Sequence, residues 1–382
     1  MFDFTLAATE GAARAGTFRT PHGEVPTPVF MPVGTLGTVK GVSPEELEAL
    51  GATVVLANTY HLYLRPGHEL VRELGGLHAF MRWNGPILTD SGGYQVFSLA
   101  HINRIEDEGV TFQSHVDGSR HLFTPESVME IQRALGADIV MAFDECPPGG
   151  ASRAAAAEAN RRTLAWLERC RVRFDALAHE TVVPEQTLFP VLQGNVYEDL
   201  RRQHARDVQA AGDWRGYGIG GLSVGEEKPA MWRAVEVLHE ELPSGVPRYL
   251  MGVGYPEDLL EAIARGCDMF DCVAPTRNAR HGTAWTAHEG QVNLKGARFR
   301  AQRDPIDPDC DCYACRRFDR AYLRHLLIAG ERFGHRLVSI HNLRFLVRLA
   351  EEARRRIGEG SFTGWKDDWL ARYRAAGAPQ HD

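Results

Sequence analysis

The chain has 382 residues, of which 44% are hydrophobic and 24% charged, and its formal net charge is −7. This composition is typical of a folded globular protein and excludes a disordered or collagen-like chain. The sequence contains no run of about 18 apolar residues, so no membrane span is predicted. The N-terminus lacks the basic and apolar regions of a signal peptide, so we expect a cytoplasmic protein.

Charge is unevenly distributed along the chain. Residues 273–376 contain 20 Lys and Arg against 12 Asp and Glu, a surplus of +8, so the remainder carries −15. An acidic body with a basic C-terminal quarter predicts that a contact with RNA or DNA, if there is one, lies on that quarter. An arginine-rich, solvated surface helix would give the same count, and charge alone does not separate the two interpretations.

One pattern repeats from about residue 28 onward: a short apolar run, a turn, and a helical stretch. The apolar runs predict eight strands, at Val29–Val33, Val54–Ala57, Ile87–Thr89, Ile139–Phe143, Leu188–Leu192, Tyr217–Ile219, Tyr249–Met251 and Met269–Cys272. Helices are predicted at Ser43–Leu50, Gly67–Leu74, Pro125–Leu135, Ala155–Phe174, Glu198–Ala211, Pro229–Glu240 and Pro256–Ala264, the first opened by a Ser43–Glu46 capping box. Strands that are apolar on both faces and alternate with helices favour an α/β protein, a parallel (β/α)8 barrel of the TIM type.

Two segments depart from this pattern. Between the third and fourth strands, alternating residues near 94–122 predict a hairpin inserted at the mouth of the barrel. After the eighth strand the last helix is delayed, and helical spacing resumes only around Leu343. We therefore divide the chain into a barrel with an N-terminal extension (1–272), an inserted basic subdomain (273–341), and the last barrel helix with a tail (342–376).

Three of the seven cysteines crowd into six residues of this subdomain, Cys310, Cys312 and Cys315. In a cytosolic chain such spacing predicts a metal site rather than a disulfide scaffold. With His341 they would complete a tetrahedral Cys3His shell, which is typical of structural zinc and leaves no open position. His325 and His335 are alternative fourth ligands, and three free thiols are the alternative to a metal.

Polar residues stand where the predicted strands end, which is where barrel enzymes place their active sites. These residues are Asp90, Asp144, Gln193 and Asp271. A single buried aspartate is often a satisfied structural group, but three carboxylates meeting at one mouth predict a site. Directly after Asp271 we expect a loop whose Arg277 and Arg280 face an anionic polymer.

Several motifs together resemble a known family. DSGGYQ, FDEC, QGN, GGLSVGE, MFDCVAPTR and C-x-C-x-x-C with a later His are similar to those of bacterial tRNA-guanine transglycosylases, also called queuine tRNA-ribosyltransferases. The likeness runs from about Thr5 to Ile357. It implies a zinc-containing barrel, usually a homodimer, with one structural Zn²⁺ per chain. Such enzymes exchange guanine at wobble position 34 of G-U-N anticodons (tRNAs for Asp, Asn, His and Tyr) through a covalent enzyme–RNA intermediate.

The resemblance also implies roles for individual residues. Asp271 would be the nucleophile that traps the oxocarbenium-like C1′, and Asp90 the general acid/base; spacing alone does not order the two. Asp144 would accept from N1–H and the 2-amino group, Gln193 and Gly221 would hold the 6-oxo group, and the side chains of two further residues would sandwich the ring. The sandwiching residues would be Tyr94 and Met251, and the remaining base contacts would be Ser91, Gly92, Gly93, Cys146, Leu222 and Val224.

Two segments match the RNA contacts of the family. They are Gly252, Val253, Gly254, Tyr255, Pro256, Glu257 and Asp258, and Thr276, Arg277, Asn278, Ala279 and Arg280. An anticodon loop with its bases splayed out suits such a site.

The pairing of Cys146 with Val224 is similar to that of family members that insert the small precursor preQ1. Members that take the bulkier queuine have a smaller residue at the second position. The two bases differ only in the 7-substituent, so one wall of the pocket decides between them. The alternative is that both side chains merely pack the core.

Three other functions each conflict with a feature of the sequence or lack one that they need. A non-catalytic RNA-binding partner subunit on the same barrel should lack one of the acids, whereas Asp90, Asp144 and Asp271 are all present. A relative of the archaeal type that acts in the D-arm normally needs further C-terminal RNA-binding domains. A zinc-dependent hydrolase needs an open metal position, which a Cys3His shell does not provide.

Overall fold

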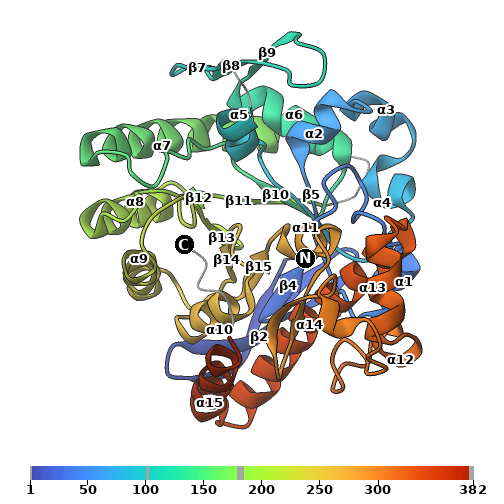
Figure 1. Ribbon diagram of the computed structural model, residues 1–382. Coiled ribbons are helices and arrows are strands. Elements are labelled where there is room, and N and C mark those ends of the chain that lie inside the picture. Colours follow the sequence, from blue (N-terminus) through green and yellow to red (C-terminus); the bar gives the residue numbers. More distant parts are fainter. Residues whose placement is uncertain (1, 100–102, 179–184, 378–382) are drawn as a thin grey trace.

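The computed structural model describes residues 2–99, 103–178 and 185–377, and it places the predicted strands side by side in parallel (Figure 1). They are β4 (Val29–Met31), β5 (Val55–Ala57), β6 (Ile87–Thr89), β10 (Ile139–Met141), β11 (Thr187–Phe189), β12 (Val191–Leu192), β13 (Tyr217–Ile219), β14 (Arg248–Leu250) and β15 (Met269–Asp271). The predicted (β/α)8 architecture is confirmed.

The hydrogen-bonded ladder is not one continuous ring. It forms two arcs, β11-β10-β6-β5 and β12-β13-β14-β15-β4. The single strand predicted at Leu188–Leu192 is divided at Pro190, because proline has no N–H to donate to a neighbour. At the other junction a parallel bridge joins Val33 to Leu56.

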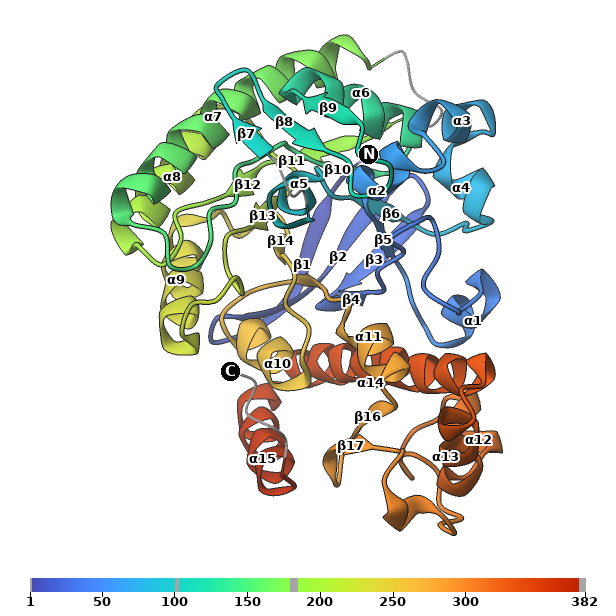
Figure 2. The same cartoon turned by 45° about the horizontal axis from the view of Figure 1, so that its top comes forward.

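Helices form the outer layer of the barrel, with α7, α8 and α9 in an arc around the strands in Figure 2. The seven predicted helices are present as α1 (Pro44–Ala49), α3 (His68–Glu73), α6 (Pro125–Leu135), α7 (Arg153–Ala176), α8 (Glu198–Ala210), α9 (Lys228–Glu241) and α10 (Pro256–Ala264). Two short helices, α2 (Thr59–Leu64) and α4 (Gly76–Met81), are additional. The Ser43–Glu46 capping box is confirmed, with each residue's side chain accepting from the other's backbone N–H.

An antiparallel sheet that the strand pattern had not revealed contributes to the core of the barrel. Its strands are β1 (Phe4–Glu10), β2 (Ala13–Thr20) and β3 (Gly23–Thr27). Phe18 is fully buried and meets Phe189 of β11 edge to face, with ring centroids 5.7 Å apart. Arg14 is bound to Asp268, the residue before β15, by an ion pair of 2.9 Å. This sheet therefore packs against the amino-terminal ends of the strands and leaves their carboxyl ends for a site.

The inserted segment is more than the predicted hairpin. It begins with helix α5 (Gly93–Leu99) and continues as the antiparallel sheet β7 (Asn103–Ile105), β8 (Val110–Gln113) and β9 (Arg120–Phe123). Val110, Phe112 and Phe123 are buried, so the sheet rests on the protein through one face.

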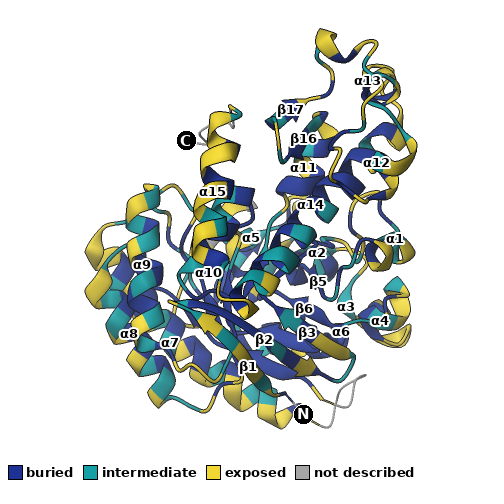
Figure 3. Ribbon diagram, turned by 90° about the horizontal axis from the view of Figure 1, so that it is seen from below, coloured by how far each residue is buried: buried dark blue, intermediate teal, exposed yellow. Residues whose placement is uncertain are grey.

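The prediction of a loop after the eighth strand is wrong, because helix α11 (Ala274–Arg280) follows at once, with a proline in its first turn. The remaining elements are β16 (Thr283–Thr286), β17 (Gly290–Asn293), η1 (Ala297–Phe299), α12 (Tyr313–Arg317), α13 (Arg320–Ile328), α14 (Arg332–Gly358) and α15 (Phe362–Ala375). The late helix thus begins well before the predicted residue 342 and is followed by a separate helix. Figure 3 shows buried residues along α11 and α14 and exposed ones along α15. Within the described ranges no helix is both long and apolar enough to cross a bilayer.

Candidate functional site

The polar residues predicted at the strand ends lie at one end of the barrel. Asp90 follows β6 directly, Gln193 follows β12, Met251 follows β14, and Asp271 is the last residue of β15. Because all these strands are parallel, their carboxyl ends open on the same face.

Asp271 is held through one of its two carboxylate oxygens. Oδ1 accepts hydrogen bonds from the Tyr249 hydroxyl (2.6 Å) and from the Gly252 N–H (2.7 Å). Among the described residues none donates to Oδ2, which leaves one lone-pair-bearing oxygen free to react. Burial raises the pKa of Asp271 above its ordinary value, although the hydrogen bond from Tyr249 lowers it in part.

Asp90 is surrounded by donors from two elements. Its carboxylate accepts from the Asn58 side chain (2.5 Å), the Thr59 N–H (2.9 Å) and the Gln95 side chain (2.9 Å). Burial raises the pKa of Asp90 to about 6, and the charge of nearby Asp271 contributes in the same direction. A carboxyl that titrates near neutral pH can both release and take up a proton.

The third acid, Asp144, is buried and forms a polar pair with Gln193. Its Oδ2 accepts from Gln193 Nε2 at 2.7 Å, and its Oδ1 accepts from the Ser91 hydroxyl at 3.1 Å. Burial raises the pKa of Asp144 to about 6. Gln193 itself is fully buried, and its Oε1 has no hydrogen-bond partner in the described part of the chain. An orphaned buried oxygen at a strand end indicates that a ligand completes the site.

Glycines leave the space around this pair. Gly221 has a φ of +64°, and a Cβ there would lie 2.1 Å from Gln193 Oε1. A Cβ on Gly93 would lie 2.7 Å from the Asp144 carbonyl oxygen. At Gly92 the φ is +79°. Any side chain at Gly221 or Gly93 would therefore displace the Asp144–Gln193 pair.

The remaining predicted base contacts differ in exposure. Tyr94, in the first turn of α5, is 53% exposed, whereas Leu222 is buried. Met251 is half-buried, and its side chain lies against Gly218: a Cβ added to that glycine would be 3.3 Å from the Met251 sulfur. Cys146 lies near the Gly221 N–H and the Gln193 side chain, and burial raises the pKa of its thiol to about 12. The thiol is therefore protonated at neutral pH and lines the site as a neutral group.

A carboxylate that sequence reasoning missed fixes the segment around Val224. Glu226 accepts hydrogen bonds from the Ser223 N–H and from the Val224 N–H, the latter at 2.9 Å. Because the C=O and N–H of one peptide point in opposite directions, the Leu222 carbonyl points away from Glu226.

The two segments predicted to contact RNA are only partly accessible. Arg277 and Arg280 are exposed on α11, but Ala279 is fully buried and Thr276 is 8% exposed. In the other segment, Glu257 and Asp258 are already paired, with Arg374 (2.8 Å) and Lys228 (2.9 Å), and the Gly252 N–H is bound to Asp271.

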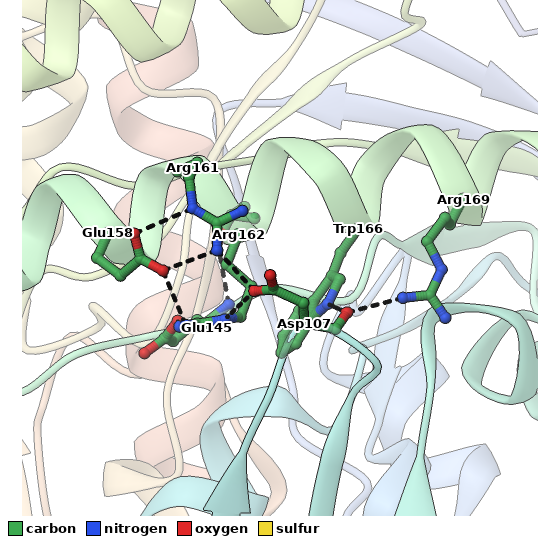
Figure 4. Close-up of polar contacts among 8 residues, drawn as sticks. Asp107, Glu145, Glu158, Arg161, Arg162, Trp166 and Arg169 are labelled. Carbon is green, nitrogen blue, oxygen red and sulfur yellow. Dashed lines mark hydrogen bonds and ion pairs between the residues drawn. The ribbon is translucent and has the colours of Figure 1, made fainter.

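An ion-pair network ties the inserted sheet to helix α7 and to Glu145 (Figure 4). Asp107, in the turn between β7 and β8, contacts Arg161 (2.6 Å) and Arg162 (3.2 Å) of α7. Arg162 also binds Glu145, the residue after Asp144. The insert is thus anchored to the strand end that carries Asp144.

The predicted metal ligands come together. Cys310, Cys312, Cys315 and His341 have ligand atoms that all lie within 4.8 Å of one another, and these side chains could hold one metal ion. His341 Nδ1 lies 3.3 Å from Cys315 Sγ and 3.9 Å from Cys312 Sγ, close to the ~3.6 Å that a nitrogen and a sulfur ligand of one tetrahedral zinc ion would be apart. His341 Nε2 lies 2.6 Å from the Trp285 carbonyl oxygen and can donate to it, which leaves Nδ1 for the metal.

His341 lies within α14, so the cluster joins the loop before α12 to the long helix. Neither His325 nor His335 belongs to the cluster. The described residues contain two other groups with ligand-type atoms this close, His22 with His78 and Asp138, and His288 with Asp307 and Asp309.

Sequence reasoning missed several residues that hold the acids. Asn58 directly follows β5, so the rule that picked out Asp90 would also have found it. Gln95 lies within the DSGGYQ motif. Tyr249 carried no such signal, since it lies inside a strand. Nor did the buried Arg201, which lies inside a helix and holds the loop at Gly220 and Gly221 instead of an acid.

Comparison with known proteins identifies a single family. A family profile described as queuine tRNA-ribosyltransferase matches residues 9–375. The queuine tRNA-ribosyltransferase of Pelotomaculum thermopropionicum is 52% identical over 372 residues, which cover 97% of this chain and 98% of that one. Those of Herpetosiphon aurantiacus and Desulforudis audaxviator are each 54% identical, over 97% of this chain and 93% and 98% of theirs. The chain belongs to the queuine tRNA-ribosyltransferase family.

Proposed function

We propose that this tRNA-guanine transglycosylase replaces the guanine at wobble position 34 of G-U-N anticodon tRNAs (Asp, Asn, His and Tyr) with preQ1. We further propose that the reaction is a double displacement in the cytoplasm, where its tRNA substrates are. The observation that carries this proposal is the meeting of two pairs of residues at one barrel mouth. Asp90 lies near enough to Asp271 for their charges to interact, and Asp144 is bonded to the incompletely bonded Gln193.

Asp271 and Asp90 suit the two halves of the reaction. In the first half, Asp271 Oδ2 bonds to C1′ of the ribose while the C1′–N9 bond breaks and its electron pair leaves with guanine, which receives a proton from Asp90. In the second half, Asp90 takes the N9 proton of the incoming base, N9 bonds to C1′, and the Asp271 carboxylate is released. Tyr249 and Gly252 keep the other oxygen of Asp271 in place throughout.

The buried pair suits a guanine edge. Asp144 offers two acceptor oxygens for N1–H and the 2-amino group, while the second N–H of Gln193 Nε2 (the first is given to Asp144) and the Gly221 N–H supply donors for the 6-oxo group. Adenine presents the reverse pattern at positions 1 and 6, so it would leave buried groups unpaired, which typically costs about 1–3 kcal/mol for each group.

The choice of preQ1 rests on the wall formed by Val224 and Cys146. Glu226 pins the Val224 N–H, so the wall cannot easily retreat from the extra ring of queuine. Overpacking a rigid site typically costs about 1–3 kcal/mol, which corresponds to a preference of about fivefold to somewhat over a hundredfold. The Leu222 carbonyl, turned away from Glu226, is available to accept from the aminomethyl cation of preQ1.

We expect mass spectrometry of tRNA for Asp, Asn, His and Tyr to show loss of guanine and gain of preQ1 at position 34. In competition, preQ1 should exceed queuine with the native enzyme, and Val224→Gly should narrow the gap. Equal use of both bases by the native protein would refute the specificity, and unchanged tRNA would refute the function itself.

The tRNA is proposed to lie over α11 and the basic segment that follows. Arg277 and Arg280 are exposed there, close to the end of β15 that carries Asp271. Removing both should weaken tRNA binding and flatten its salt dependence, because each phosphate contact contributes to the salt slope. Binding of free guanine, measured by calorimetry, should be unchanged. Normal tRNA affinity in the double variant would place the RNA elsewhere.

We propose that two copies associate through an exposed aromatic cluster on α12, α13 and α14. Phe318 contacts Tyr313, Tyr322 and Phe333 at ring-centroid distances of 5.4–5.6 Å, and these three rings are 50%, 41% and 36% exposed. Exposed aromatic groups of this kind mark interfaces. Light scattering should give a dimer mass that Tyr322→Glu reduces to that of a monomer, while Val172→Glu on α7 should leave it unchanged. A native monomer would refute this assignment.

The metal of the Cys3His cluster is proposed to be zinc, at one equivalent per chain. Three thiolates and one imidazole fill a tetrahedral shell, so the ion would serve folding and leave the chemistry to the carboxylates.

A further inference from the structure

We infer that Arg201 is a positioning residue for base recognition, which aims the N–H groups of Gly221 and Leu222 at the 6-oxo group of the purine. The inference rests on the proposed function and adds a residue from behind the pocket, on helix α8, that does not touch the base itself.

Arg201 is fully buried, and its guanidinium donates hydrogen bonds to backbone carbonyls. Its Nε donates to the Asn195 oxygen (2.6 Å), its Nη1 to those of Leu192 (3.0 Å) and Gly220 (2.9 Å), and its Nη2 to that of Gly221 (3.2 Å). Four of its five N–H groups are therefore used. Among the described residues its hydrogen-bond partners are all backbone oxygens, and none is a carboxylate. Burial lowers its pKa to about 10, so it remains charged at neutral pH.

The direction of these bonds decides which way the loop faces. The C=O and N–H of a planar trans peptide point in opposite directions. Since the Gly220 and Gly221 carbonyls point at Arg201, the N–H groups that follow them, those of Gly221 and Leu222, point away from it. The Gly221 N–H accordingly faces the Cys146 thiol, on the side of the pocket where Gln193 lies.

The loop needs such a brace. Gly221 adopts a left-handed φ of +64°, and a Cβ there would strike Gln193 Oε1, so glycine is required. Glycine also leaves the backbone free to rotate, and the neighbouring Gly220 adds to this freedom. The planar fork of Arg201 donates to both glycine carbonyls at once and so restricts the rotation of the backbone at these two residues.

The charge of Arg201 adds a second effect. When the C1′–N9 bond breaks, its electron pair leaves with the purine and is shared with the 6-oxo oxygen. The fixed positive charge of Arg201, behind the peptides of Gly221 and Leu222, stabilises the negative charge that develops on the 6-oxo oxygen, in the manner of an oxyanion hole. Burying an arginine without a carboxylate partner is costly, and this use accounts for it.

The test compares guanine with 2-aminopurine, which lacks the 6-oxo group. We expect Arg201→Lys, which keeps the charge but not the fork, to weaken guanine binding by about tenfold or more while 2-aminopurine binding stays within about twofold. Arg201→Gln, which loses the charge as well, should also lower the single-turnover rate of adduct formation. Binding is measured by competition against labelled guanine, with folding checked by circular dichroism.

Arg202 provides the matched control, because it is the next residue on α8 but pairs with Glu240 and Glu241 at the surface. Arg202→Lys should change the binding of neither guanine nor 2-aminopurine. If Arg201→Lys weakens the binding of both bases equally, or of neither, the inference is overturned. If the lysine variant does not fold, the same comparison is made with Arg201→Gln. A native protein that exchanges no guanine into tRNA would instead refute the proposed function.

Discussion

Asp271→Asn is expected to abolish the covalent enzyme–RNA adduct and to reduce base exchange on the order of 10³-fold or more, because an amide is not a nucleophile toward C1′. The fold should persist, since the amide oxygen can still accept from Tyr249 and Gly252. Denaturing gel electrophoresis of the enzyme incubated with tRNA measures the adduct directly.

Two further variants make this result specific. Asp90→Asn should lose turnover but retain some adduct, because the nucleophile is intact and only the proton transfer is impaired. Asp268→Asn is the structural control: Asp268 is fully buried and lies just before the same strand, but it is bound to Arg14 away from the site. It should lose stability and keep the adduct. An adduct that survives in Asp271→Asn would reverse the roles of the two acids.

Cys312→Ser is expected to lose the bound zinc and several kcal/mol of stability, because binding of a structural metal is coupled to folding. Cys312 caps α12 and lies beside His341 of α14, so its loss would release the loop from the long helix. Elemental analysis and thermal melting measure the two effects.

Cys170→Ser provides the control for this experiment. Cys170 is another fully buried free cysteine, but it lies on α7, outside the metal cluster. The control should keep one equivalent of zinc. Full zinc and an unchanged melting curve in Cys312→Ser would show that the cluster is not the metal site.

The sequence by itself determined the features that depend on local pattern. The alternation of apolar runs with amphipathic stretches predicted the strands and the seven helices, since burial requires each periodicity. Because the strands are parallel, their ends share one face, and this rule selected Asp90, Gln193 and Asp271 before any geometry was known. Close spacing of Cys310, Cys312 and Cys315 was sufficient to predict a metal cluster.

Only the tertiary structure decided how these residues are held. Tyr249 and Gly252 fix Asp271 across 22 and 19 positions of the chain, and such hydrogen bonds leave no periodic trace in a sequence. The same holds for Arg201, which reads as an ordinary helix residue but braces a loop 20 positions away. The pKa of Asp90 rises because neighbours distant in sequence exclude water and bring a second charge close. Hydrogen bonding and desolvation depend on distance in space, and the folded chain alone sets that distance.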